Sequence, residues 1–153
     1  IINGELILLQ NRGFSLVFFS APQCVYCDEF APHFNYVANR VTGCNFYFCD
    51  INEEKQIEQS SQYTKTPITY VPLVLLFANG KIIDQYFPDE QNPNNNTELL
   101  VNFLKTKTSR YSAPQVANSA YGGIPYNINP VRSKTRTCKL SDMYTKMTYP
   151  KDG

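Results

Sequence analysis

With 153 residues the chain is long enough for one domain with its own hydrophobic core and an appendage. Its net charge of +1, with both signs mixed, gives neither a basic nor an acidic field, so we expect no nucleic-acid partner. Five cysteines are too few, and odd in number, for the disulfide framework of a small secreted protein, which favours a reducing compartment.

The sequence also gives no sign of membrane association. No apolar run reaches the roughly 20 residues that a spanning helix needs. The segment that starts at Ile1 lacks the basic and then apolar layout of a signal peptide. We expect no membrane partner, and the compartment stays open.

The first half of the chain alternates between helical and strand patterns. Residues Glu5 to Arg12 carry apolar positions on one helical face, which predicts a first helix. The run Phe14 to Ser20 is short, apolar and rich in β-formers, as is typical of a strand buried on both faces. Apolar side chains at helical spacing predict a second helix from Cys24 to about Arg40. Residues 45–51 predict another buried strand.

The alternation continues beyond this strand. A helix-forming segment covers 52–63, and residues 71–87 contain two strands joined by Asn79-Gly80, a strong hairpin signal. Thr97 is the expected N-cap of a last helix. The order α-β-α-β-α-β-β-α predicts an α/β fold with a mixed central sheet flanked by helices.

The pattern ends after about residue 107. Residues 108–153 have scattered tyrosines and prolines, a Gly-Gly pair and no sustained period, so they offer too little apolar surface for a second core. We therefore expect a domain at 1–107 and, at 108–153, an extended C-terminal arm whose order depends on a partner. Its tyrosines and prolines suit a strap on neighbouring subunits.

The chemistry of the sequence is concentrated in Cys24-Val25-Tyr26-Cys27, a C-x-x-C motif between a strand and a helix. Backbone N–H groups and the macrodipole at a helix N-terminus stabilise an anion, so the pKa of Cys24 should fall from ~8.5 toward about 3.5–7.5. Cys24 is the expected nucleophile. Cys27 lies about one turn deeper and is the expected resolving thiol.

Taken together, the element order and several motifs resemble the thioredoxin-like superfamily, over roughly residues 4–107. The motifs are the C-x-x-C after a strand, Ala31-Pro32 in the same helix, and Val71-Pro72 opening a later strand that continues as LLFANGK. The resemblance is to this superfamily and to its disulfide-isomerase-like domains, not to thioredoxin itself.

The resemblance implies the rest of the site. In this superfamily the proline that matches Pro72 is cis and faces the dithiol, and the backbone beside it pairs with the substrate peptide. Val71 and Pro72, with the inner pair Val25 and Tyr26, are therefore the expected substrate-binding residues. The implied partner is a protein thiol or disulfide, and we expect neither a cofactor nor a metal.

The chain departs from thioredoxin at positions that matter for catalysis. It has no tryptophan, and Val25-Tyr26 replaces Gly-Pro between the cysteines. The buried aspartate that assists the resolving cysteine in thioredoxins matches Phe18, and its lysine partner lies near Phe48. Without that acid, desolvation should disfavour the Cys27 thiolate, so we expect modest catalytic efficiency.

A zinc site is the main alternative for the cysteines. Cys24, Cys27, Cys44 and Cys49 are spaced like a four-cysteine site. However, strand alternation sends positions 44 and 49 to opposite faces, so redox chemistry is favoured, with both as buried packing residues. Cys138 receives no role. His33, the only histidine, could polarise Cys27 only from an inward position, and a solvated one is favoured.

Two functions follow. The first is a thiol–disulfide oxidoreductase that acts on protein thiols through Cys24 and Cys27. The second is a thioredoxin-like interaction module in a large assembly such as a virion, anchored by residues 108–153. The intact dithiol favours the first, and the missing acid and the long arm favour the second.

Overall fold

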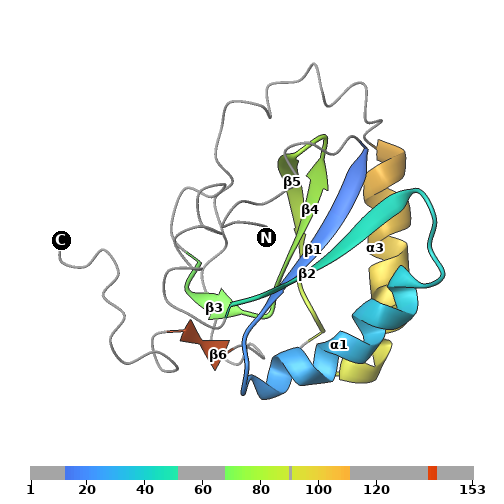
Figure 1. The fold of residues 1–153 in the computed structure, drawn as a ribbon. Helices are drawn as coiled ribbons and strands as arrows, with labels where there is room; N and C mark the ends of the chain where they lie inside the picture. The colour runs from blue at the N-terminus through green and yellow to red at the C-terminus, as the bar shows by residue number, and fades with distance from the viewer. Residues whose placement is uncertain (1–12, 52–67, 90, 111–137, 141–153) are drawn as a thin grey trace.

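The fold is a mixed sheet with two helices packed beside it (Figure 1). The computed structural model describes residues 13–51, 68–89, 91–110 and 138–140. The expected helices at 5–12 and 52–63 lie outside these residues. Over the described ranges the predicted thioredoxin-like α/β architecture is confirmed.

Four strands form the main sheet, in the order β2-β1-β4-β5. Central strand β1 is parallel to β2 and antiparallel to β4, and β4 and β5 form an antiparallel hairpin. The predicted strands are confirmed, with β2 beginning one residue early. Their bounds are β1 Phe14–Ser20, β2 Cys44–Asp50, β4 Leu73–Ala78 and β5 Lys81–Tyr86.

The turn between β4 and β5 has the backbone that its sequence demands. Asn79 and Gly80 have φ values of 53° and 84°, the left-handed pair of a tight hairpin that Asn-Gly adopts with little strain. The Asn79 side chain accepts a hydrogen bond from the Gly13 N–H at 2.7 Å. This turn is therefore tied to the start of β1.

Helices α1 (Val25–Ala38) and α3 (Asn96–Arg110) lie on the same side of the sheet (Figure 1). A 3-10 turn, η2 (Pro93–Asn95), leads directly into α3, so Thr97 lies inside the helix and the prediction that it is the N-cap was wrong. Thr97 instead bonds His33 of α1, with Oγ1 and Nδ1 2.7 Å apart. No helix among the described residues has the length and apolar character to cross a bilayer.

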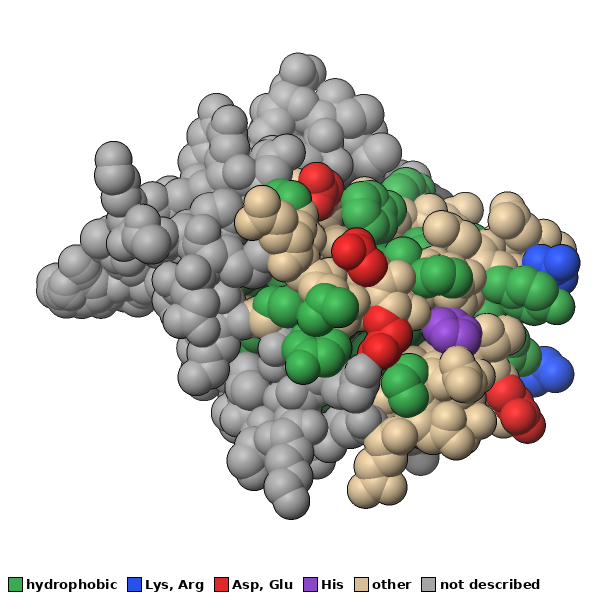
Figure 2. All heavy atoms as spheres, turned by 90° about the horizontal axis from the view of Figure 1, so that it is seen from below, with side chains coloured by type: hydrophobic (Ala, Val, Ile, Leu, Met, Phe, Trp, Pro, Cys, Tyr) green, Lys and Arg blue, Asp and Glu red, His purple; other side chains and the backbone are tan. Residues whose placement is uncertain are grey.

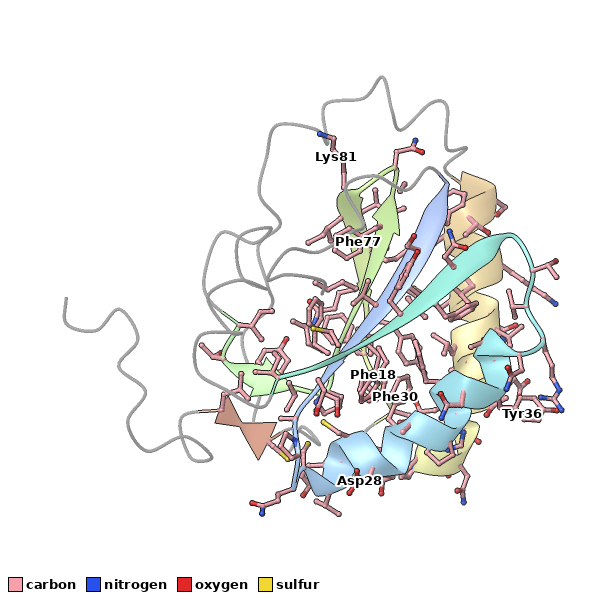
Figure 3. The ribbon with its side chains drawn as sticks, viewed as in Figure 1. Phe18, Asp28, Phe30, Tyr36, Phe77 and Lys81 are labelled. Atoms are coloured by element: carbon pink, nitrogen blue, oxygen red, sulfur yellow. The ribbon has the colours of Figure 1, made fainter. Side chains whose placement is uncertain are left out.

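An aromatic cluster fills the space between α1 and the sheet. Phe18 of β1 is fully buried, and its ring meets the ring of Phe30 edge to face at 5.1 Å between centroids (Figure 3). Phe34 lies 5.2 Å from Phe18, and Tyr86 stacks on Phe30 at 5.8 Å. Such pairs contribute about 0.5–1.5 kcal/mol each beyond their area burial. The cluster fixes the position of α1 over the end of β1.

A second, two-stranded sheet lies beside the start of α1. Strand β3 (Tyr70–Val71) pairs antiparallel with β6 (Cys138–Lys139). The Tyr70 hydroxyl accepts a buried hydrogen bond of 2.9 Å from Gln85 of β5, which holds β3 against the main sheet. Although β6 is distant in sequence, Figure 1 shows it directly below β3.

Residues 138–140 belong to the expected C-terminal arm and show where that part of it lies. Leu140 is fully buried in the domain core, and its N–H donates to the Thr69 carbonyl at 2.9 Å. At this point the expectation of a segment outside the core was wrong, because one apolar side chain and one short strand suffice to dock. Helix α3 also continues to Arg110, beyond the expected boundary at 107. The division into domain and arm stays a prediction.

Candidate dithiol site

Cys24 is the N-cap residue of α1. Its backbone is extended, with φ −101° and ψ 104°, and its sulfur accepts the Cys27 N–H at 3.2 Å. Its carbonyl accepts the Asp28 N–H at 3.1 Å, as the first helical bond. The helix thus begins where the sequence predicts, and one of its unsatisfied N–H groups points at the Cys24 sulfur.

The second cysteine lies in the first turn of the same helix. Cys27 is 1 % exposed and Cys24 is fully buried. Both are free thiols. Cys24 and Cys27 are therefore close neighbours in a site shielded from solvent.

The expected substrate-binding residues beside the dithiol are only partly exposed to solvent. The Cys24 thiol lies 3.9 Å from the Val71 carbonyl oxygen, at hydrogen-bond distance for sulfur. The peptide bond between Val71 and Pro72 is cis, and both residues are buried. Val25 is 63 % exposed, whereas Tyr26 is half-buried. Figure 2 shows the face that carries α1, where hydrophobic and acidic side chains lie side by side.

The two thiols perturb each other. The hydrogen bond to Cys27, together with burial, raises the pKa of Cys24. The same bond lowers the pKa of Cys27, against the effect of burial. The sequence predicted a lowered pKa at Cys24, whereas its hydrogen bond to Cys27 and its burial raise that pKa. The two thiols therefore titrate as a coupled pair.

Ser20 is a site residue that the sequence did not reveal. Its hydroxyl and the Ala21 backbone hydrogen-bond Cys27 and contribute to its lowered pKa. The position expected for a buried acid is apolar, since Phe18 is packed against the Phe30 and Phe48 rings. The Cys27 thiolate is therefore stabilised by hydrogen bonds instead of being disfavoured by burial, as the missing acid had suggested. The only hint in the sequence is that Ser20 ends the strand just before the motif.

Cys138 is a second residue that the sequence left without a role. In the β3–β6 ladder it lies opposite Val71, whose carbonyl oxygen is next to the Cys24 sulfur. Cys138 and Cys24 share a side-chain hydrogen bond. Figure 3 shows sulfur atoms gathered where β6 meets the start of α1. A sequence separation of more than a hundred residues hides this contact from local patterns.

The other cysteines lie elsewhere. Cys44 is half-buried and pairs with Phe14 at the start of β1, the end opposite the dithiol, and Cys49 is buried and pairs with Phe19. Among the described residues no group of three or more His, Cys, Asp or Glu side chains could hold a metal ion. His33 is half-buried, lies at the surface in Figure 2, and bonds Thr97 of α3. It is therefore partly solvated, and its printed hydrogen bond is to α3 and not to Cys27.

A groove of about 460 Å³ lies between the start of β2 and α3, lined in part by Arg40, Cys44 and Leu104. Like Cys44, it belongs to the far end of β1, and none of the dithiol residues lines it. It is not part of the candidate site.

Comparison with known families agrees with this geometry. The sequence matches the family model described as Thioredoxin over residues 5–106, which is more than half of the chain. The chain belongs to the thioredoxin family. Membership covers the dithiol, Pro72 and most of α3, and it ends before residues 138–140.

The chain also resembles a viral protein over about half of its length. The chain is 37% identical over 76 residues to the uncharacterized protein 196R of Invertebrate iridescent virus 6. That match covers 48% of this chain and 44% of the relative, so the chain spans less than half of the relative's length.

Solved thioredoxins resemble the structure at low identity. Mala s 13, the thioredoxin of Malassezia sympodialis, is 23% identical with a TM-score of 0.47, and the match covers 62% of this chain and 76% of that protein. The oxidised thioredoxin of Plasmodium falciparum is 19% identical with a TM-score of 0.45, and the match covers 63% and 86%.

Proposed function

We propose that this protein is a thiol–disulfide oxidoreductase whose substrates are protein disulfides or thiols. Cys24 is the attacking sulfur, Cys27 is the resolving sulfur, and Val71, Pro72, Val25 and Tyr26 contact the substrate. The observation that carries the proposal is a pair of buried free thiols at the start of α1, with the Cys27 N–H donated to the Cys24 sulfur at 3.2 Å.

The assignment of the two roles rests on position. Cys24 is at the N-cap and neighbours the Val71 carbonyl, whereas Cys27 is bonded on its inner side by Ser20 and Ala21. A partner that takes the place of β6 on β3 therefore meets Cys24 first. The shared proton can pass along the hydrogen bond to Cys27, which leaves the charge on Cys24 for attack.

Reduction of a substrate disulfide then takes two exchange steps. The Cys24 thiolate attacks one substrate sulfur, a mixed disulfide forms, and the other substrate sulfur leaves as a thiolate. The Cys27 proton passes to the departed substrate thiolate, and the Cys27 thiolate attacks Cys24, so a disulfide forms between Cys24 and Cys27 and the second substrate sulfur leaves as a thiolate that takes its proton from water. Two electrons pass from the dithiol to the substrate.

A turnover assay tests the proposal. Insulin disulfides are the substrate, dithiothreitol is the final reductant, and the variants are Cys24→Ser, Cys44→Ser and the double variant Cys27→Ser with Cys138→Ser. Cys24→Ser should reduce the rate to that of dithiothreitol alone, and the double variant should accumulate a mixed disulfide at Cys24. Cys44→Ser, at the far end of β1, should match the unaltered protein. Equal rates for Cys24→Ser and Cys44→Ser would refute the proposal.

A second candidate is a thioredoxin-like module in a large assembly, such as a virion, with residues 108–153 docked on neighbouring subunits. The observation in its favour is that a relative belongs to a virus. Limited proteolysis tests it. Protection of residues 111–137 and 141–153 only within an isolated native assembly would support it, and equal protection in the free chain would contradict it.

A further inference from the structure

The chain places a third thiol against its own dithiol, and the backbone fixes the position. Cys138 is opposite Val71 in the antiparallel β3–β6 ladder. The next residue but one, Leu140, donates its N–H to the Thr69 carbonyl and is fully buried in the core. Strand pairing and an apolar anchor together hold Cys138 in register.

The contact is with Cys24. The Cys24 thiol lies 3.9 Å from the carbonyl of Val71, the residue that pairs with Cys138, and the two cysteines share a side-chain hydrogen bond. The backbone N–H groups of Val25 and Tyr26 also hydrogen-bond Cys138. Its influence on Cys27 is electrostatic and last among the causes that act there. Cys138 therefore reaches the outer sulfur of the pair.

We propose that Cys138 is a third exchange cysteine, the internal disulfide partner of Cys24, brought into line by the pairing of β6 with β3. This inference rests on the proposed function, since the disulfide that enters the exchange comes from a protein disulfide reduced by Cys24 and Cys27. While β6 is paired, its segment also occupies the edge of β3 next to Cys24. An external protein disulfide has to displace it.

The exchange is balanced and needs no further oxidant. Starting from the disulfide between Cys24 and Cys27, the Cys138 thiolate attacks the Cys24 sulfur. The bond between Cys24 and Cys138 forms, the bond to Cys27 breaks, and the electron pair leaves on Cys27, which takes up the proton lost by Cys138. One disulfide and one thiol are present before and after the step.

The position of Cys138 selects the sulfur that it attacks. Cys138 lies opposite Val71, whose carbonyl oxygen is 3.9 Å from the Cys24 sulfur, so Cys24 is the sulfur within its reach and Cys27 is the leaving group. Return attack by Cys27 on Cys24 releases Cys138 again, so the third cysteine can pass a disulfide between the dithiol and an outside thiol.

Disulfide mapping tests the inference on the full chain. The Cys27→Ser variant is treated with oxidised glutathione, quenched with acid and digested with trypsin. Cleavage after Arg12, Arg40, Arg136 and Lys139 should yield the peptide 13–40 joined to the peptide 137–139. The link should form even with about 1 mM glutathione present, because a tethered thiol has an effective concentration in the millimolar range or above. Glutathione on Cys24 with Cys138 reduced would overturn the inference.

A register variant separates fixed geometry from a loose tether. In Cys138→Ser with Lys139→Cys and Cys27→Ser, the thiol moves by one residue along β6, and neighbouring strand positions face opposite sides. Linkage to Cys24 should then be at least about tenfold slower, since only an aligned pair gains the intramolecular advantage. Equal rates for the two positions would mean that β6 does not direct the exchange.

The same digests distinguish failure of this inference from failure of the proposed function. In the chain with all its cysteines, oxidation should also give a disulfide within the peptide 13–40. If that disulfide forms and insulin is reduced, but Cys138 never joins Cys24 in the Cys27→Ser variant, only the third cysteine fails. If Cys24 stays reduced in every variant and insulin is not reduced, both proposals fail.

Discussion

Cys27 is buried and Cys44 is half-buried, yet their pKa values move in opposite directions and the more buried thiol is the more acidic. The pKa of Cys27 is lowered because the Cys24 thiol, the Ser20 hydroxyl and the Ala21 backbone hydrogen-bond its sulfur. The pKa of Cys44 is raised to about 11, because one backbone hydrogen bond at Leu16 does not offset its burial. The two sites lie at opposite ends of β1.

The comparison teaches that donors, and not burial alone, decide which thiol is reactive. Removing a thiolate from water without hydrogen-bond partners disfavours it, and two or three donors can reverse that effect. The donors to Cys27 come from Cys24, from Ser20 at the end of β1 and from the Ala21 backbone that follows, and the helix N-terminus supplies one to Cys24. Cys44, at the start of β2, lies beside a groove, and a single backbone hydrogen bond at Leu16 lowers its pKa.

The largest expected effect is the separation of the two titrations. Cys27 should titrate below the range of an ordinary thiol and Cys44 with a pKa of about 11, so the two steps should be separate. At neutral pH a larger fraction of Cys27 than of Cys44 should be thiolate. Thiolate absorbance in the ultraviolet, recorded as the difference between the reduced protein and Cys27→Ser or Cys44→Ser, measures each step. A single common step would remove the distinction.

A smaller effect is expected from Ser20→Ala. The substitution removes one donor to the Cys27 sulfur, so the pKa of Cys27 should rise, but by less than the gap that separates Cys27 from Cys44. A hydrogen bond to a charged group contributes about 1.5–3 kcal/mol. Ser15→Ala is the matched control, because Ser15 is also a buried serine of β1 but lies at the end near Cys44. An unchanged titration in Ser20→Ala would show that this hydroxyl does not act on Cys27.

Much of the fold could be predicted from the sequence, because the patterns that indicate each element lie in neighbouring residues. The run Phe14 to Ser20 gave β1 with its bounds, and Asn79-Gly80 gave the hairpin, since both depend on residues next to each other. The start of α3 was misplaced because η2 precedes it and Thr97 bonds across to His33. The sequence of either helix alone does not predict a contact between the two helices.

The candidate site could also be predicted in part from the sequence. The C-x-x-C motif and Val71-Pro72 located the dithiol and the strand beside it, whereas the distribution of acidity between the thiols was not predicted. That distribution depends on Ser20 and on the orientation of the thiol proton, which spacing does not encode. Cys138 was missed for a related reason, since its role follows from a β3–β6 ladder that joins distant segments.

The central claim is that Cys24 and Cys27 form a reversible redox pair, and a redox equilibrium tests it most directly. The full chain is equilibrated in mixtures of reduced and oxidised glutathione, quenched with acid, alkylated and mapped. The account predicts that the peptide 13–40 passes reversibly between a dithiol and an internal disulfide over a defined range of mixtures, while Cys44 stays alkylatable throughout. Absence of that disulfide at every mixture, or its formation only together with oxidation of Cys44, would contradict the account.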